Sequence, residues 1–441
     1  MPHNLRRDLG VVESYAALLG ILIGAGIFKV TGVAWELTGP SVILGYLVLA
    51  PAILATSVAY SVFVSTPMGR EPGGEYTHIS RVFGGHGLAF VGAWLKIISY
   101  IGALAYLSRA FGDYVQQLFG GRGDVMWIAV GCLLFFYAIH VAGVRWFGRL
   151  QVWMCIVLGV SIVVLVVPGL FAIRVGNYKP FFTGGVGGFA AALPPLFFAY
   201  AGFESLAQTA GEVRDSTSRL PRVFLRGIVA TMIIYLLMSV VAFGALPAAK
   251  LKGSAAPMAD AAAQYLPIGA AMLVAIGAIM AITTSVNATM LVPSRIAIML
   301  AGDGLAPRWC GRVSPRTGTP IAGLTATLVA ALLLLLSGQI GLALNIAVFA
   351  LVVLYFIHSI ALLRIPPSLA KQVTVKTPRW LQLAAAWLSI AAMGTLIALQ
   401  LRDRDLVLLA AGWSAVGLVF YLLRRIPHRG AAGRVENAEE T

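Results

Sequence analysis

Two glycine-containing stretches decide the fold: Gly24-Ala-Gly-Ile-Phe28 and Tyr200-Ala-Gly-Phe-Glu204. Each lies near the middle of an apolar run that is long enough to cross a bilayer core, which takes about 20 helical residues. Lipid offers the backbone no hydrogen-bonding partner, so both runs are expected to be helices, and the glycines mark an interruption in each. Taken singly, either stretch also fits close packing of glycine against a neighbouring helix.

Similar apolar runs fill most of the chain. Hydrophobic residue types make up 59% of the 441 residues and charged types 11%, whereas a soluble domain carries about 25% charged residues. Membrane helices are predicted at residues 11–37, 39–64, 84–118, 124–143, 148–172, 186–212, 222–247, 264–301, 319–337, 339–363, 380–401 and 405–425.

The two interrupted runs are the first and the sixth of these twelve. Interrupted segments in corresponding positions of two halves indicate an inverted repeat with a binding site at its centre, as in secondary transporters. We therefore predict an all-α integral membrane protein of 12 transmembrane helices, with a 5+5 inverted repeat and broken helices 1 and 6. The first repeat spans 11–172, the second spans 186–363, and two extra helices follow within 380–425.

The charges predict how the chain is oriented. The formal net charge is +15, and most of the Lys and Arg residues fall in segments on one side of the predicted helices. Positive charge marks the cytoplasmic side, so both termini, 1–10 and a disordered tail at 426–441, are predicted to be cytoplasmic. Anionic membrane lipids, rather than nucleic acid, are the expected partners of this charge. The basic start lacks a cleavage site for a signal peptide, so the first run is expected to be retained as a helix.

Each helix break exposes backbone groups of one polarity. Amide N–H groups at the start of a half-helix lack intrahelical partners and carry partial positive charge. A carboxylate is therefore expected to bind at the first break, on the residues Gly24, Ala25, Gly26 and Ile27. At the sixth helix, the free carbonyls of Phe198, Ala199 and Ala201 are expected to accept hydrogen bonds from an ammonium group. The two sites together predict a zwitterionic amino acid as substrate.

An ordered set of motifs accompanies the two breaks. It comprises Pro72-Gly-Gly-Glu-Tyr76, Phe198-Ala-Tyr-Ala-Gly-Phe-Glu204, Glu212-Val-Arg-Asp215, Arg219-Leu-Pro-Arg222, Ser294-Arg295, Asp303-Gly-Leu-Ala-Pro-Arg308 and Gly318-Thr-Pro320. With this set the chain resembles the amino acid–polyamine–organocation (APC) transporter superfamily, which has the LeuT-type fold. The resemblance implies that Phe198 is an aromatic gate and that Ala199, Ala201, Gly202 and Phe203 line the pocket. Ser99 is a further candidate, although its hydroxyl is expected to bond its own helix.

The coupling ion has two candidates. Glu204 is the acidic residue placed well inside the membrane, where ionisable groups are functional candidates, unless it ties two helices together in protonated form. The fifth predicted helix lacks the lysine that proton-coupled relatives often carry. The eighth resembles the pattern of sodium-coupled relatives, which favours Na⁺ over H⁺. The resulting sodium site comprises Gly20, Ile23, Ala281, Thr284 and Ser285, and the alternative is that both hydroxyls bond their own helix.

Other charged residues allow two interpretations. Structural ion pairs are favoured over a transport role for Lys29 and Lys96. The arginine clusters at 214–226 and 308–316 are topology signals, or else gate residues that pair with Glu71, Glu75, Glu212 or Asp215.

These features predict a secondary active transporter of small or apolar neutral L-amino acids in the cell (plasma or inner) membrane, working by alternating access. An exchanger and a transporter of cationic amino acids or polyamines remain alternatives, and a substrate-sensing receptor or channel is a remote one. No enzyme is predicted, because the six histidines are scattered and no HExxH or Gly-x-Ser-x-Gly motif occurs. No cofactor is expected beyond the coupling ion, and the oligomeric state stays open.

Overall fold

The computed structural model describes residues 7–24, 26–247, 250 and 257–425, and within these ranges the chain is helical with no strand beyond one isolated β-bridge. The predicted all-α class is therefore confirmed. The first half contains α1 (Val11–Ile23), η1 (Gly26–Val30), α2 (Thr31–Thr38), η2 (Gly39–Ser41), α3 (Val42–Val64), η3 (Pro67–Arg70), α4 (Glu75–Phe83), α5 (His86–Leu118), α6 (Val125–Ala142), α7 (Val144–Gly169) and η4 (Val175–Tyr178).

The second half continues with the same pattern of long apolar helices. It contains α8 (Gly185–Tyr200), α9 (Ser205–Gln208), η5 (Ala210–Glu212), α10 (Ser216–Ala245), α12 (Pro257–Ala262), α13 (Ile268–Gly302), η6 (Arg308–Gly311), α14 (Ile321–Leu336), α15 (Ile340–Leu363), α16 (Pro367–Ala370), α17 (Arg379–Gln400) and α18 (Arg404–Arg425).

Ten helical stretches of the described chain are long and apolar enough to cross a membrane. One of them, Val11–Val64, spans the first two predicted helices, and Ile321–Leu336 is a shorter apolar helix of 16 residues. The structure therefore supports a multi-pass membrane protein, while the count of twelve and the repeat symmetry stay predictions. The predicted tail at 426–441 lies outside the described residues.

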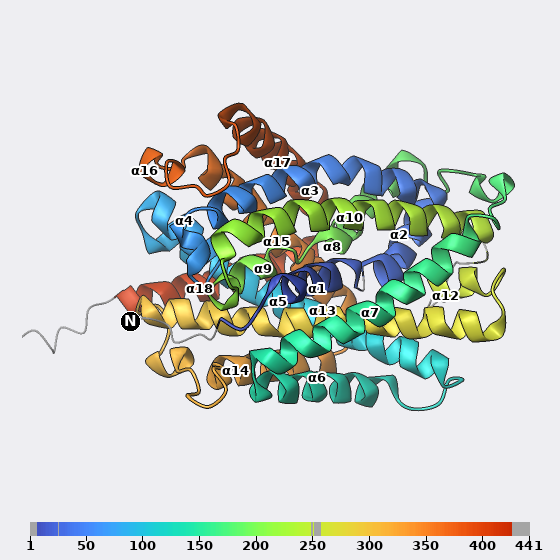
Figure 1. Ribbon diagram of the computed structural model, residues 1–441, viewed down its shortest axis with the longest axis horizontal. Helices are drawn as coiled ribbons and strands as arrows, with labels where there is room; N and C mark the ends of the chain where they lie inside the picture. The colour runs from blue at the N-terminus through green and yellow to red at the C-terminus, as the bar shows by residue number, and fades with distance from the viewer. Residues whose placement is uncertain (1–6, 25, 248–249, 251–256, 426–441) are drawn as a thin grey trace, which may run out of the picture.

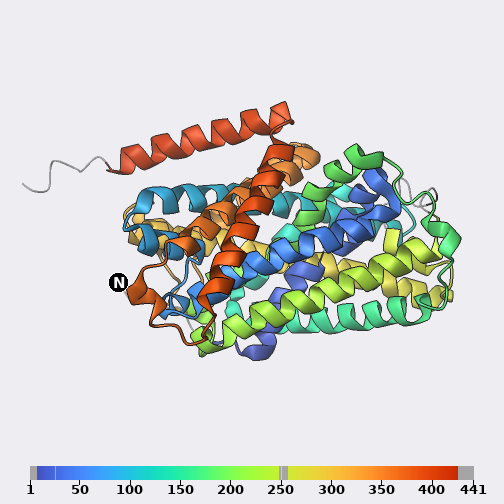
Figure 2. The same ribbon diagram turned by 90° about the horizontal axis from the view of Figure 1, so that it is seen from above.

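The helices form one bundle whose centre is α5. This helix packs against α13, α15, α6 and α14, while α1 packs against α7, α10 and α13. Figure 1 shows the helices side by side, with α4 and α16 at the end of the bundle where the described chain begins. In Figure 2, α18 lies along the outer edge, where it contacts α15 and α5.

The end of the bundle that carries residues 7–9, η3, α4 and the start of α10 is called the N-terminal end below. Leu9 forms a parallel bridge with Val213, in which Leu9 N–H donates to Glu212 O at 3.0 Å and Arg214 N–H donates to Leu9 O at 3.0 Å. This bridge ties the start of the chain to the segment that follows the second helix break. Sequence patterns gave no sign of it, because it joins two single residues far apart in the chain.

Several helix boundaries differ from the sequence predictions, and α10 begins at Ser216 rather than at residue 222. The fifth helix begins at Val144 rather than at residue 148, because Gly143, at φ 114°, ends α6 and allows α7 to start at once. The segment at 72–83, predicted to lie between helices, contains α4, whose first five residues are buried. The glycines before α4 provide the turn: Gly73 and Gly74 have φ of 100° and 48°.

Candidate functional site

The first predicted helix is broken at the expected place. α1 ends at Ile23, Gly24 caps it with non-helical torsion angles, and a π-helical turn, η1, starts at Gly26. A Cβ atom on Gly24 would collide with Ser285 Oγ and lie 2.8 Å from Ala281 O, so only glycine fits there. Ala25, one of the predicted carboxylate-binding residues, lies outside the described residues, and Ile27 is fully buried.

The sixth helix is also broken where predicted. α8 ends at Tyr200, Ala201 is extended, and Gly202 has φ 103°, a conformation that side chains other than glycine rarely adopt. α9 then resumes the helical path for one turn, starting at Ser205. The two breaks lie against each other, because a Cβ on Gly26 would be 2.7 Å from Ala199 Cα.

The expectation of free carbonyls at the second break was wrong for two of the three groups. Phe198 O accepts a hydrogen bond from Ala201 N at 3.1 Å, and Ala199 O accepts one from the Tyr235 hydroxyl at 2.6 Å. The Tyr235 hydroxyl also contacts Leu22 O on α1. Tyr235, on α10, therefore links the backbones of both broken helices. The sequence could not reveal this, because tyrosine is common in membrane helices and its partners are backbone atoms.

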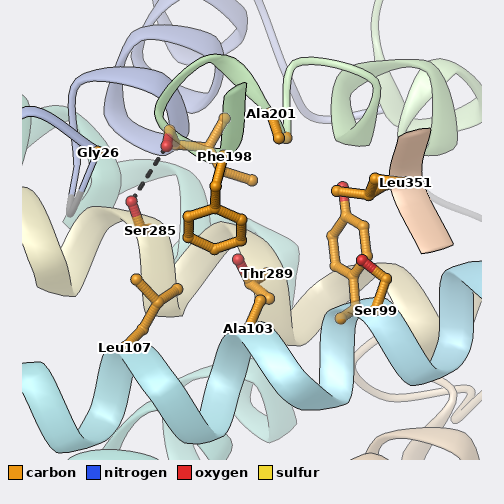
Figure 3. A pocket seen from close by; sticks show the side chains of 12 residues that line it. Gly26, Ser99, Ala103, Leu107, Phe198, Ala201, Ser285, Thr289 and Leu351 are labelled. Carbon is orange, nitrogen blue, oxygen red and sulfur yellow. Dashed lines mark hydrogen bonds between the residues drawn. The ribbon is translucent and has the colours of Figure 1, made fainter. Parts of the chain in front are cut away.

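A small cavity lies between the two breaks and α5 (Figure 3). Its volume of about 30 Å³ has room for about one or two water molecules, which is too little for an amino acid. None of the lining residues carries a charge. They are Ile21, Gly26, Ser99, Tyr100, Ala103, Leu107, Phe198, Ala201, Gly202, Ser285, Thr289 and Leu351.

Five of the predicted substrate residues line this cavity: Gly26, Ser99, Phe198, Ala201 and Gly202. Figure 3 shows the Phe198 side chain pointing from α8 toward α5. Its ring also meets Tyr106 edge to face at 6.0 Å between ring centroids.

The other described candidates do not line the cavity; they are Gly24, Ile27, Ala199 and Phe203. Gly24 and Ala199 pack against neighbouring helices, and Phe203 is buried among other aromatic rings. The Phe203 ring lies 5.2 Å from that of Tyr60 and 5.3 Å from that of Tyr355, centroid to centroid. Sequence position alone does not tell which way a residue points once the helix is interrupted.

The wall contributed by α5 was missed apart from Ser99. Ser99, Ala103 and Leu107 are spaced by four residues, so they form one stripe on the helix that faces the cavity. The prediction that Ser99 bonds its own helix was wrong: its hydroxyl donates to Ala347 O on α15 at 2.8 Å. The spacing of four residues could have indicated a shared helix face. In so apolar a helix, however, the sequence does not show which face turns toward the cavity.

The candidate cation site brings together four of its five predicted residues. Thr284 Oγ1 lies 2.8 Å from Gly20 O and 2.6 Å from Ala281 O, and Ser285 Oγ lies 3.3 Å from Gly20 O. Ile23 is buried at the end of α1, and no described contact joins it to either hydroxyl. Hydroxyl and carbonyl oxygens suit a hard cation. Both hydroxyls bridge to α1 rather than only to their own helix.

Next to this cluster lies Gln151, a fully buried residue of α7. Its amide Nε2 donates to Ala16 O at 3.3 Å and to Thr284 O at 3.2 Å, and its Oε1 accepts from Asn287 at 2.8 Å. An uncharged amide therefore connects α1, α7 and α13 next to the cluster. Gln151 was not singled out in the sequence.

Glu204 is fully buried beside the second break. Its carboxyl group accepts hydrogen bonds from the Tyr100 hydroxyl at 2.6 Å and from Gly202 N–H at 2.9 Å, and it contacts the Tyr355 hydroxyl. Among the described side chains no lysine, arginine or histidine pairs with it. Glu204 thus joins α5, α15 and the break, and Tyr100 connects it to the cavity wall.

A second buried carboxylate, Glu75, pairs with Lys96. Lys96 Nζ donates to both oxygens of Glu75 at 2.9 and 2.8 Å, and Gln208 Nε2 donates to one of them at 2.6 Å. The structural ion pair expected for Lys96 is therefore present, and it connects α4, α5 and α9. Burial raises the pKa of Glu75, and the Lys96 ammonium acts in the opposite direction. The side chain of Lys29 lies outside the described part.

Most of the acidic residues do not pair with the arginine clusters that the sequence suggested as partners. Glu212 pairs with Arg295 of α13 at 2.9 Å, with both side chains buried, rather than with the arginine clusters. Asp215 does pair with Arg219 at 2.8 Å, on the surface. Both pairs lie at the N-terminal end. The motif Ser294-Arg295 marked the right arginine, but only the tertiary structure shows that its partner is Glu212.

Comparison with known proteins identifies the family. The family model described as amino acid permease matches residues 15–421. The chain belongs to the amino acid permease family. This permease is 25% identical over 341 residues to the branched-chain amino acid permease BcaP of Bacillus subtilis, which covers 72% of each chain.

Other relatives of the permease carry different names. It is 29% identical over 356 residues to the vacuolar cationic amino acid transporter 2 of Arabidopsis thaliana, covering 74% of this chain but 54% of that protein. The chain thus spans about half the length of this plant relative. It is also 26% identical over 336 residues to the methylthioribose transporter of Bacillus subtilis, covering 72% of each. These proteins are transporters, so the prediction that the chain is not an enzyme agrees with its family.

Proposed function

We propose that this permease carries small or apolar neutral L-amino acids across the cell membrane by alternating access. The observation that carries the proposal is the uncharged cavity between two broken helices. Its walls combine backbone at the breaks with small and apolar side chains such as Ala103, Leu107 and Leu351. Polar backbone suits the ammonium and carboxylate groups that all amino acids share, and apolar walls suit a side chain without charge.

Cationic substrates are the alternative, since some relatives are named cationic amino acid transporters. A buried cationic group needs a carboxylate partner. Glu204 is the nearest candidate, but three donors already surround its carboxyl group, and it is not part of the cavity wall. This arrangement favours neutral substrates.

We further propose that a cation drives transport, with Na⁺ at the oxygen cluster of Gly20, Ala281, Thr284 and Ser285 favoured over a proton on Glu204. The cluster joins α1, one of the broken helices, to α13. An ion bound there would hold α1 against α13. Because α1 also forms part of the substrate site, ion binding and substrate binding would be coupled. The two hydroxyls would turn their protons away from Gly20 O to coordinate the ion. Both termini are proposed to be cytoplasmic.

The test is uptake of labelled alanine and leucine into proteoliposomes that hold the purified permease, with sodium and proton gradients imposed separately. Accumulation that follows the sodium gradient and is lost in Thr284→Ala supports the oxygen cluster. Accumulation that follows only the proton gradient moves the coupling to Glu204, and counterflow without either gradient identifies an exchanger. Displacement of leucine by arginine or putrescine at lower concentration than by alanine would contradict the neutral-substrate proposal.

A further inference from the structure

A second, larger cavity lies at the N-terminal end of the bundle, apart from the substrate site. Its volume is about 350 Å³. Four separate segments of the chain meet there: the first described residues, η3, the start of α10 and the segment between α16 and α17. The cavity is lined by Arg7, Arg70, Asp215, Ser216, Thr217, Ser218 and Thr374.

The start of α10 presents unpaired backbone donors to this cavity. α10 is 30 residues long, and Asp215 occupies the N-cap position at φ 50° without capping the helix through its side chain. The carboxylate of Asp215 instead pairs with Arg219 at 2.8 Å. The amides of Ser216 and Thr217 therefore have no acceptor within the helix, and the partial positive charge of the helix end remains.

Ser216 supplies the observation that points to a ligand. Its side chain is 1% exposed and lines the cavity, and its Oγ has no hydrogen-bond partner among the described residues. Buried hydroxyl groups nearly always have a partner. Neighbouring Thr374, in contrast, is satisfied, since its hydroxyl donates to Thr217 O at 2.6 Å and contacts Ser65 O at 3.0 Å.

Two arginines complete the lining. Arg7 Nη2 lies 3.5 Å from Arg70 O, so the two residues are neighbours at the mouth of the cavity. Within the described part of the chain, neither guanidinium forms an ion pair with a carboxylate. Because Arg219 already neutralises Asp215, the lining has an excess of positive charge.

We propose that this cavity binds a phosphate group, carried either by the headgroup of an anionic phospholipid or by a soluble phosphate. The two guanidinium groups, the amides at the start of α10 and the Ser216 hydroxyl are the donors that recognise its oxygens. The ligand would join the first residues of the chain to η3 and α10, next to the Leu9–Val213 bridge. It therefore stabilises the closed form of this end of the permease, whichever amino acid is carried.

The experiment measures the unfolding temperature of the full-length permease in uncharged detergent. Three additions are compared: phosphatidylglycerol, phosphatidylcholine and inorganic phosphate. Binding to the folded state alone raises the unfolding temperature as the ligand concentration rises. Phosphatidylglycerol is expected to raise it more than phosphatidylcholine. A rise with inorganic phosphate as well assigns the site to soluble phosphates, and a rise with phosphatidylglycerol alone assigns it to lipid headgroups.

Variants test whether the cavity is the site. In Arg7→Gln/Arg70→Gln the half-saturating ligand concentration is expected to rise about tenfold or more, because charge-assisted hydrogen bonds are lost. The charge-matched control is Arg312→Gln/Arg316→Gln, two exposed arginines between η6 and α14, and it should respond like the unmodified chain. Ser216→Ala removes only the unpartnered hydroxyl and should weaken binding without reducing stability in the absence of ligand.

Two results would overturn the proposal. One is the lack of any difference between phosphatidylglycerol, inorganic phosphate and phosphatidylcholine with the unmodified chain. The other is an equal loss of response in both double variants, which would mean that positive charge in general, rather than this cavity, attracts the anion. Because the readout is binding, it does not depend on whether the transported substrate is the one proposed above.

Discussion

At the scale of single residues, glycine serves two purposes at the helix breaks. Gly24 and Gly26 are required because neighbouring helices approach too closely for a Cβ atom, whereas Gly202 is required because its φ of 103° lies in the left-handed region. Both explanations of these glycines therefore hold: they interrupt the helices, and they allow neighbouring helices to pack closely. Packing allows the broken helices to touch, and the touching backbones form one side of the cavity.

The substitution Gly26→Val is expected to abolish uptake while the protein is still produced. A Cβ at this position would lie 2.7 Å from Ala199 Cα and 2.8 Å from the Tyr235 hydroxyl, so the two breaks would be forced apart. Uptake by proteoliposomes and the amount of folded protein are to be measured together. Gly131→Val is the control, because a Cβ on Gly131 of α6 meets open space. Normal uptake by Gly26→Val would contradict the assignment of the site.

Ala103 is predicted to set the size limit for the substrate side chain. It lines the cavity on α5, so Ala103→Leu would fill space that a substrate side chain needs. Leucine uptake should fall about tenfold or more relative to alanine uptake, since one or two methylene groups are worth that much discrimination in an apolar pocket. The control is Val91→Leu on the same helix. Val91 is 45% exposed, so this change should leave the ratio of leucine to alanine uptake unchanged. An unchanged ratio in Ala103→Leu would show that the substrate side chain lies elsewhere.

At the scale of elements, α5 organises the interior with two different faces. Lys96 and Tyr100, four residues apart, reach the buried carboxylates of α4 and the second break, while Ser99, Ala103 and Leu107 face the cavity. One helix therefore supports both the short α9 and the wall of the site. On α4, burial lowers the pKa of His78 to about 3 and keeps its ring neutral.

Loss of the Lys96 charge should destabilise the whole bundle. Lys96→Met leaves Glu75 buried without its cation, which costs about 3–5 kcal/mol of unfolding free energy. The double variant Glu75→Gln/Lys96→Met should recover most of this loss, because neither charge then remains. Unfolding in detergent micelles is the measurement. Arg81→Met is the matched control: Arg81 pairs with Glu71 on the surface, and its loss should cost at most about 1 kcal/mol. A similarly small loss in Lys96→Met would show that Glu75 is protonated.

At the scale of the whole molecule, two contacts tie together segments at the N-terminal end of the bundle. The Leu9–Val213 bridge and the buried Glu212–Arg295 pair both join the segment after α9 to other parts of the bundle. The cavity between the two breaks has room for only about one or two waters, so an amino acid would fit there only after helices move apart. Alternating access requires that one end opens at a time.

A disulfide across this bridge should therefore arrest transport. Residues bridged in this way lie about 4.8 Å apart, within the range that a disulfide spans. In a background in which Cys132, Cys155 and Cys310 are replaced, Leu9→Cys/Val213→Cys should lose uptake on oxidation and regain it on reduction. The two single variants should not respond to oxidant. Full uptake by the cross-linked protein would show that the N-terminal end does not open between these two segments.

The sequence by itself determined the local features. Hydrophobic length predicted the helices, glycine in two apolar runs predicted both breaks, and Thr284 and Ser285 marked a cluster that does meet α1. Ordered motifs also identified the family. These properties depend on neighbouring residues in the chain and on the demand of the lipid for satisfied backbone groups, so they can be read without a structure.

Only the tertiary structure decided which groups meet. The wall of α5, the partners of Glu75 and Glu212, and the Tyr235 bridge between the breaks all join residues far apart in the chain. In an apolar helix every face looks similar in sequence, so the face that turns inward is set by packing against the other helices. The same holds for charge: packing brings Lys96 to the buried Glu75 and Arg295 to the buried Glu212, whereas the buried Glu204 meets hydroxyl and amide donors instead.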